Sequence, residues 1–74
     1  MFTIKVIDHR DGEPLEYKTV CVHYSGFFGG HTCDVKTNSR GEAHFDYRNG
    51  VGKIYVGSKV VYEGEISGYM VVEL

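Results

Sequence analysis

The chain has 74 residues, a net charge of −2 and two cysteines, and 42% of its residues are hydrophobic. A chain this short forms one domain, here residues 1–74, and buries only about 60% of its unfolded surface. Its eight lysines and arginines are scattered rather than clustered, which argues against a nucleic-acid-binding protein.

Short β-branched and aromatic runs recur along the chain, and no stretch has the 3.6-residue periodicity of a helix. Seven strands are predicted, at residues 2–7, 17–24, 31–37, 42–47, 52–56, 59–63 and 69–73. Alternation directs Ile4, Val6, Val20, Val22 and Phe45 toward one interior. Strands this short, with turns every 8 to 12 residues, are typical of a small antiparallel sandwich or barrel. We therefore predict an all-β fold, a small seven-stranded antiparallel β-sandwich.

One near palindrome, Cys-x-His followed by seven residues and His-x-Cys, spans Cys21, His23, His31 and Cys33. A hairpin symmetric about Phe27 would place all four side chains on one face, as in a disulfide or a tetrahedral zinc site. These four residues are therefore the candidate metal ligands.

A hairpin shifted by half a residue would instead pair Val20 with Val35 and Val22 with Cys33. Burying roughly two more valine-sized groups is worth about 3 to 5 kcal/mol. We therefore favour the shifted register, with Cys33 buried, Cys21 exposed and no metal or other cofactor. It also places Cys21 and His23 on the opposite face from Cys33 and His31.

Two further connections have distinct signals. Gly57-Ser58 suits a two-residue type II′ hairpin that sets Ile54 opposite Val61 and Tyr55 opposite Val60. The adjacent aromatics Phe27 and Phe28 lie in a glycine-rich tip, where they either cover the open end of the sandwich or contact a partner or a sugar ring.

A set of motif positions runs along nearly the whole chain: Asp8, Gly12, Pro14, Leu15, Val20, Val22, Thr37, Gly41, Phe45, Gly52 and Val56. At these positions the chain resembles the carboxypeptidase regulatory-like, or prealbumin-like (transthyretin-like), β-sandwich family. Asn38 and Ile54 depart from the family pattern, as does Asn-Gly-Val-Gly at residues 49–52. The resemblance implies Greek-key topology and an accessory or recognition role. It also favours an arch between the two sheets at residues 48–52 over an Asn49-Gly50 hairpin, which would pair Phe45 with Ile54.

The transthyretin-related hydroxyisourate hydrolases are similar to this chain at Thr37, Asn38 and Gly41. Those enzymes have a histidine where this chain has Lys5, and this chain lacks their C-terminal Tyr-Arg-Gly-Ser.

The other candidate catalytic groups are two histidines and two acidic residues. We expect His9 and His44 to be solvated surface imidazoles and the Glu63 and Glu65 carboxylates to be exposed. No catalytic residue is assigned, and the expectation is a protein that is not an enzyme.

The expected function is a binding or structural module with an unidentified protein partner. Strands 2–7 and 69–73 are expected at sheet edges, where another chain or a second copy adds a strand. Val71, Phe27 and Phe28 are the candidate contacts. The alternatives are a small Cys2His2 metal-binding protein or a hydrolase of the resembling group. With no ~20-residue apolar run and no signal peptide, we expect no membrane contact and a soluble, cytoplasmic protein, unless the chain is an excised domain.

Overall fold

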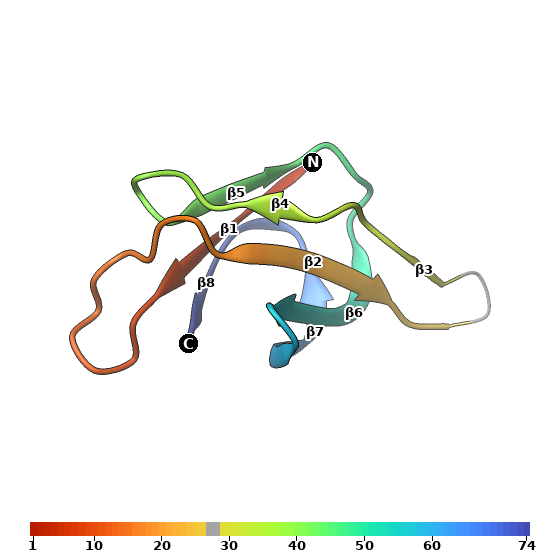
Figure 1. The fold of residues 1–74 in the computed structure, drawn as a ribbon. Coiled ribbons are helices and arrows are strands. Elements are labelled where there is room, and N and C mark those ends of the chain that lie inside the picture. The colour runs from red at the N-terminus through yellow and green to blue at the C-terminus, as the bar shows by residue number, and fades with distance from the viewer. Residues whose placement is uncertain (27–28) are drawn as a thin grey trace.

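The computed structural model describes residues 1–26 and 29–74, and within these ranges it is all β (Figure 1). The strands are β1 (Phe2–Ile7), β2 (Thr19–Tyr24), β3 (Gly30–His31), β4 (Val35–Lys36), β5 (Glu42–Phe45), β6 (Gly50–Val56), β7 (Lys59–Ile66) and β8 (Gly68–Glu73). One sheet has the order β5-β1-β8, and the other has the order β3-β2-β6-β7 with β4 also paired to β2. The predicted all-β sandwich is confirmed. In the described residues there is no helix of the length and apolarity needed to cross a membrane.

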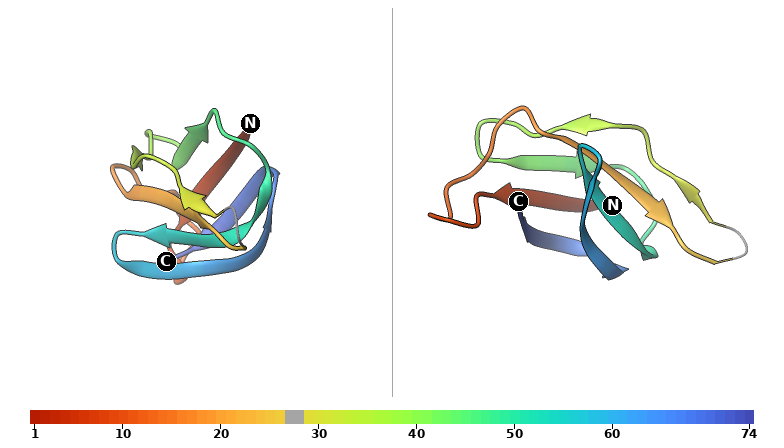
Figure 2. Two further views of the ribbon diagram at one scale, coloured as in Figure 1. Left: turned by 90° about the vertical axis from the view of Figure 1, so that its right-hand side faces the viewer. Right: turned by 60° about the horizontal axis from the view of Figure 1, so that its bottom comes forward.

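The core lies between the inward faces of the two sheets (Figure 2). Alternation along each strand supplies it, as predicted, because every second side chain points to the same face. The Phe2 and Phe45 rings stack there with centroids 5.0 Å apart. The buried hydrophobic residues are Phe2, Ile4, Val6, Val20, Val22, Ala43, Phe45, Ile54, Val56, Ile66 and Val72.

Strand β1 is the centre of its sheet, so its prediction as an edge strand is wrong. It pairs antiparallel with β5 and parallel with β8, and the sheet is therefore mixed rather than purely antiparallel. Gly68, the first residue of β8, has φ +63 at the point where the chain passes from β7 into the other sheet. Strand β1 contributes three buried residues to the core, and partner strands on both sides keep its backbone groups paired. The place of a strand in the sequence does not show whether it has one neighbour or two. The prediction of β8 as an edge strand is confirmed.

The predicted third strand, residues 31–37, is two short strands separated by a β-bulge. Val20 faces Val35, as the shifted register predicted. Beyond this pair the symmetric register applies, because Val22 faces Thr32 and His23 faces His31. Two residues, Cys33 and Asp34, lie opposite the single residue Cys21, which is the two-against-one arrangement of a bulge. This extra residue also accounts for eight strands where seven are predicted.

Thr32 rather than Cys33 occupies the interior position opposite Val22. Its N–H donates to the Val22 carbonyl at 2.9 Å, and its hydroxyl oxygen accepts from the Val22 N–H at 3.0 Å. The predicted burial of Cys33 is therefore wrong: Cys33 is exposed and Cys21 is half-buried. A buried threonine is tolerated because both backbone groups of Val22 and its own hydroxyl are paired.

The two predicted connections in the second half of the chain are largely confirmed. Residues 57 and 58 form a two-residue turn with Gly57 at φ +64, and Tyr55 faces Val60. Ile54 faces Tyr62 instead of Val61, because an irregularity between Ile54 and Tyr55 shifts the register. Strands β5 and β6 belong to different sheets, which confirms the arch over the hairpin.

Candidate functional site

The outer edge of β8 presents backbone groups that make no bond to β1. The Leu74 N–H donates to the Ile7 carbonyl at 2.9 Å, which fixes the side of the strand that faces β1. Backbone groups alternate in direction from residue to residue along a strand. The residues whose N–H and C=O groups point away from β1 are Tyr69, Val71 and Glu73.

The opposite edge of the same sheet is blocked by a turn. The Asn38 N–H donates to the Glu42 carbonyl at 2.9 Å, and the Asn38 Oδ1 accepts from the Glu42 N–H at 3.0 Å. These bonds use the outward-facing backbone groups of Glu42, at the start of β5. Strand β8 is therefore the more open edge of this sheet.

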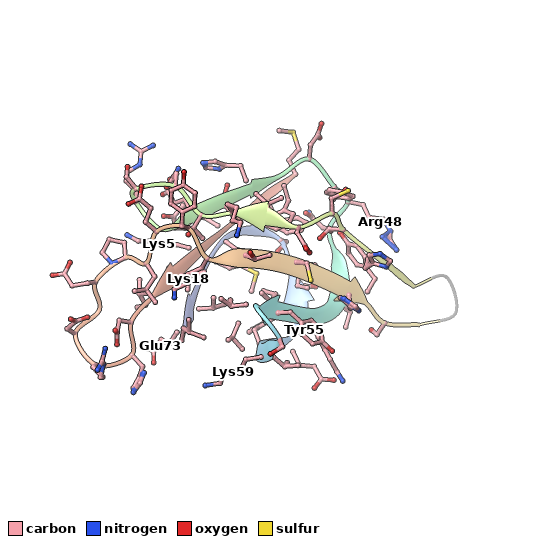
Figure 3. All side chains as sticks on the ribbon, viewed as in Figure 1. Lys5, Lys18, Arg48, Tyr55, Lys59 and Glu73 are labelled. Atoms are coloured by element: carbon pink, nitrogen blue, oxygen red, sulfur yellow. The ribbon has the colours of Figure 1, made fainter. Side chains whose placement is uncertain are left out.

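Val71, the predicted contact residue, lies in the middle of this open edge. The residue is 54% exposed, and Tyr69 on the same face is 56% exposed. Glu73 carries the only charge in the strand and lies at its end (Figure 3). The edge thus combines free backbone groups with exposed apolar side chains, a pairing that natural sheets usually avoid.

A polar network that local sequence patterns did not reveal lies beside this edge, on the outer face of the three-stranded sheet. The Tyr69 hydroxyl donates to Glu42 Oε2 at 2.5 Å, reaching across β1, and Arg40 Nε lies 3.5 Å from the other carboxylate oxygen. The hydrogen bond from Tyr69 lowers the pKa of Glu42, and the same bond raises the pKa of Tyr69. The alternation of side chains along β8 could have indicated that Tyr69 lies on the outer face. Its partner Glu42 could not be predicted in this way, because the contact depends on the order of the strands.

His44 extends this network toward a surface hollow. Its Nδ1 lies 2.9 Å from the Thr3 hydroxyl, and its Nε2 lies 3.7 Å from Glu42 Oε1. The hollow, of about 420 Å³, is lined partly by Thr3 and His44. A hydroxyl, an imidazole and a carboxylate in this order resemble a nucleophile relay, but 3.7 Å exceeds a hydrogen bond. His44 is also 62% exposed, as predicted for a surface imidazole.

The other polar candidates lie apart from this face. His9 Nδ1–H donates to an oxygen of Leu74 at 2.8 Å, which ties the first loop to the end of β8. The pKa of Asp8 is held well below its usual range by hydrogen bonds from Arg10. The Glu63 and Glu65 side chains are exposed on β7, as predicted.

Of the four candidate metal ligands, the structure brings only the two histidines together. His23 and His31 are cross-strand neighbours with ring centroids 5.4 Å apart. The two cysteines lie at the bulge and have different environments. Cys33 is exposed, whereas Cys21 is half-buried beside Asp34. Outside residues 27 and 28, no three histidine, cysteine or acidic side chains converge as metal ligands.

Phe27 and Phe28, the remaining candidate contacts, lie outside the described residues.

Comparisons with family models, curated proteins and solved structures found no match.

The contacts of Thr37 bear on the hydrolase resemblance, which this residue carries together with Asn38 and Gly41. Thr37 is buried, and its hydroxyl accepts from the Lys18 N–H at 2.9 Å and donates to the Leu15 carbonyl at 2.7 Å. It anchors the first long loop to β4, which is a structural role.

Proposed function

We propose that this chain is a non-enzymatic β-sandwich module of the carboxypeptidase regulatory-like or prealbumin-like type, and that it works by adding a strand at β8. The observation that carries the proposal is the open β8 edge. Three alternate residues there, Tyr69, Val71 and Glu73, point their backbone N–H and C=O groups away from β1. Two of them, Tyr69 and Val71, are also large exposed hydrophobic residues. Main-chain hydrogen bonds supply affinity in strand addition, and alternate side chains supply specificity.

The partner that best fits this edge is an antiparallel strand from a second copy of the chain. A twofold axis at Val71 would place Val71 against its own copy and Tyr69 against Glu73 of the partner subunit. No like charges face each other in this register, and about six backbone hydrogen bonds form between the outward-facing residues. The inward-facing Met70, which is only half-buried, would gain cover from Val72 across the new pair.

Sedimentation equilibrium over a range of concentrations tests this proposal. The wild-type chain should shift from the mass of one chain toward twice that mass as concentration rises. Val71→Lys should hold it at the single-chain mass, because two lysines would then face each other across the axis. Val51→Lys is the matched control, since Val51 is 55% exposed but lies on β6, a strand with partners on both sides.

Amide hydrogen exchange gives an independent measure of the same edge. The Tyr69, Val71 and Glu73 amides should exchange quickly in dilute solution and become protected at high concentration. A chain that stays at single-chain mass throughout, with these three amides protected, would contradict strand addition at β8. Protection that appears only with an added extended peptide would support strand addition and replace the second copy as the partner.

A further inference from the structure

His23 and His31 form a pair on the outer face of the five-stranded sheet, which we call the histidine pair. Both side chains are exposed, and they come from facing positions on β2 and β3. The histidine pair is separate from the β8 edge, which belongs to the other sheet. A function of the histidine pair is therefore independent of strand addition at β8.

The hydrogen-bond pattern brings these two side chains as close as a sheet allows. Val22 exchanges hydrogen bonds with Thr32, so the next pair along the ladder, His23 with His31, is a non-hydrogen-bonded pair. Side chains at such positions are closer than at hydrogen-bonded positions, with Cβ atoms about 4.5 to 5.5 Å apart. The bulge at Cys33 and Asp34 creates this register, because without it His31 would not face His23.

The spacing of the rings matches that of two imidazoles on one metal ion. A metal–nitrogen bond of about 2.0 to 2.1 Å and a tetrahedral angle place the two ring centroids about 5 Å apart. The centroids of the histidine pair are 5.4 Å apart, and the ring planes differ by 27°. This centroid separation therefore leaves room for one ion bound by a nitrogen from each ring.

A tyrosine on the neighbouring strand supports this arrangement. The ring of Tyr55 lies 4.6 Å from that of His23, centroid to centroid, and Figure 3 shows Tyr55 below β2. His23 thus has ring neighbours in both Tyr55 and His31. This contact restricts the rotamers of His23 and lowers the entropy lost when a ligand fixes the ring.

We propose that His23 and His31 are a bidentate site for a divalent first-row transition-metal ion, with water completing the coordination. Imidazole nitrogen suits Zn²⁺, Ni²⁺ and Cu²⁺, and among these the general order of affinity places Cu²⁺ first. This site differs from the Cys2His2 arrangement suggested by the palindrome, because neither cysteine contributes a ligand.

Lys53 is the residue that tunes the site. It faces His23 from β6 and in turn faces Glu63 on β7, so these side chains share the outer face with the histidine pair. An ammonium group beside a bound dication opposes binding. A carboxylate at the same position would instead supply a third ligand, as in sites built from two histidines and a glutamate.

Calorimetric titration with NiCl2 and with ZnCl2 tests the proposal on the full chain. We expect one ion per chain, and either His23→Ala or His31→Ala should weaken binding at least about tenfold, because the second ligand then no longer binds intramolecularly. His9→Ala and His44→Ala are the matched controls and should leave the affinity unchanged. Circular dichroism should show that all four variants keep the strand signal.

Two further variants separate the ligand set from nearby groups. The double variant Cys21→Ser with Cys33→Ser should bind Ni²⁺ as the wild type does, and loss of binding there would overturn the proposal. Lys53→Glu should tighten binding by more than the charge-only control Lys53→Gln. The proposal also fails if the wild type does not bind either ion, or if His23→Ala and His31→Ala bind as tightly as the wild type.

Discussion

The Tyr69 hydroxyl donates a 2.5 Å hydrogen bond to the Glu42 carboxylate across the intervening strand β1. This bond joins both edges of the three-stranded sheet on its outer face, and it favours one protonation state of each partner, a neutral phenol with a charged carboxylate. The pKa of Glu42 is lowered and that of Tyr69 is raised as a result.

The first prediction is that this pair contributes stability between two pH limits. The lowered pKa of Glu42 contributes stability that is present above its ordinary value, 4.5, and lost as pH falls through the folded value. The raised pKa of Tyr69 contributes stability that is present below its ordinary value, 10.0, and lost as pH rises through the folded value. Urea unfolding across pH should show both losses.

The variants Glu42→Gln and Tyr69→Phe test this prediction separately. Tyr69→Phe should reduce the loss at alkaline pH. It should also reduce the acid-side loss, because Glu42 then keeps only its cationic neighbours. In Glu42→Gln, ultraviolet titration should place the Tyr69 pKa closer to its ordinary value. An unchanged tyrosine titration in that variant would contradict the assignment.

The second prediction is that the two thiols differ in reactivity. Burial raises the pKa of Cys21, and Asp34 beside it raises that pKa further, whereas Cys33 is exposed. Because the thiolate is the reactive form, Ellman's reagent should modify Cys33 first and Cys21 more slowly. Cys33→Ser should leave only the slow phase, and Asp34→Asn should accelerate it. Equal rates for both thiols would contradict the structure.

The third prediction is that Gly52 cannot be replaced by alanine without loss of stability. A Cβ at this position would crowd two backbone atoms of β2, the His23 carbonyl oxygen and, at 2.9 Å, the Tyr24 Cα. Separating β2 from β6 should cost about 1 to 3 kcal/mol in the free energy of unfolding. At Gly50 the nearest atoms belong to the Tyr24 ring, at 3.1 Å, so Gly50→Ala is the milder control. Equal costs for the two variants in urea titrations would show that the backbone contact at Gly52 is not limiting.

The fourth prediction concerns the direction of the amides in β8. The Val71 N–H points to the open edge, so Val71→Pro removes no hydrogen bond within the chain and should cost little stability. The Met70 N–H points toward β1, so Met70→Pro removes a ladder hydrogen bond and should lower the free energy of unfolding by about 1 to 3 kcal/mol. A larger loss for Val71→Pro than for Met70→Pro, measured by thermal unfolding, would show that the strand faces the other way.

The pattern of single residues determined the interior of this protein. Alternation in the first strand alone identified Ile4 and Val6 as core residues, because side chains in any strand alternate between faces whatever its partners are. Local chemistry also determined the Gly57-Ser58 turn, since only its own two residues must adopt the required dihedral angles.

The pairing of strands was decided only by tertiary structure. The register of β2 against β3 and β4 depended on a bulge, and the bulge depended on whether Thr32 could satisfy the backbone groups of Val22. Buried apolar area alone favoured Cys33 over Thr32 opposite Val22. A buried hydroxyl costs free energy unless it has hydrogen-bond partners, and the partners of Thr32 are known only from the tertiary structure.

The candidate sites follow the same division. Val71 could be chosen from its place in an apolar, almost uncharged terminal run, but its outward amide follows from the parallel pairing of β8 with β1. Tyr69 meets Glu42, and His23 meets His31, because of strand order and register. Contacts between residues distant in sequence depend on which strands become neighbours, and local alternation determines which faces are buried without determining those neighbours.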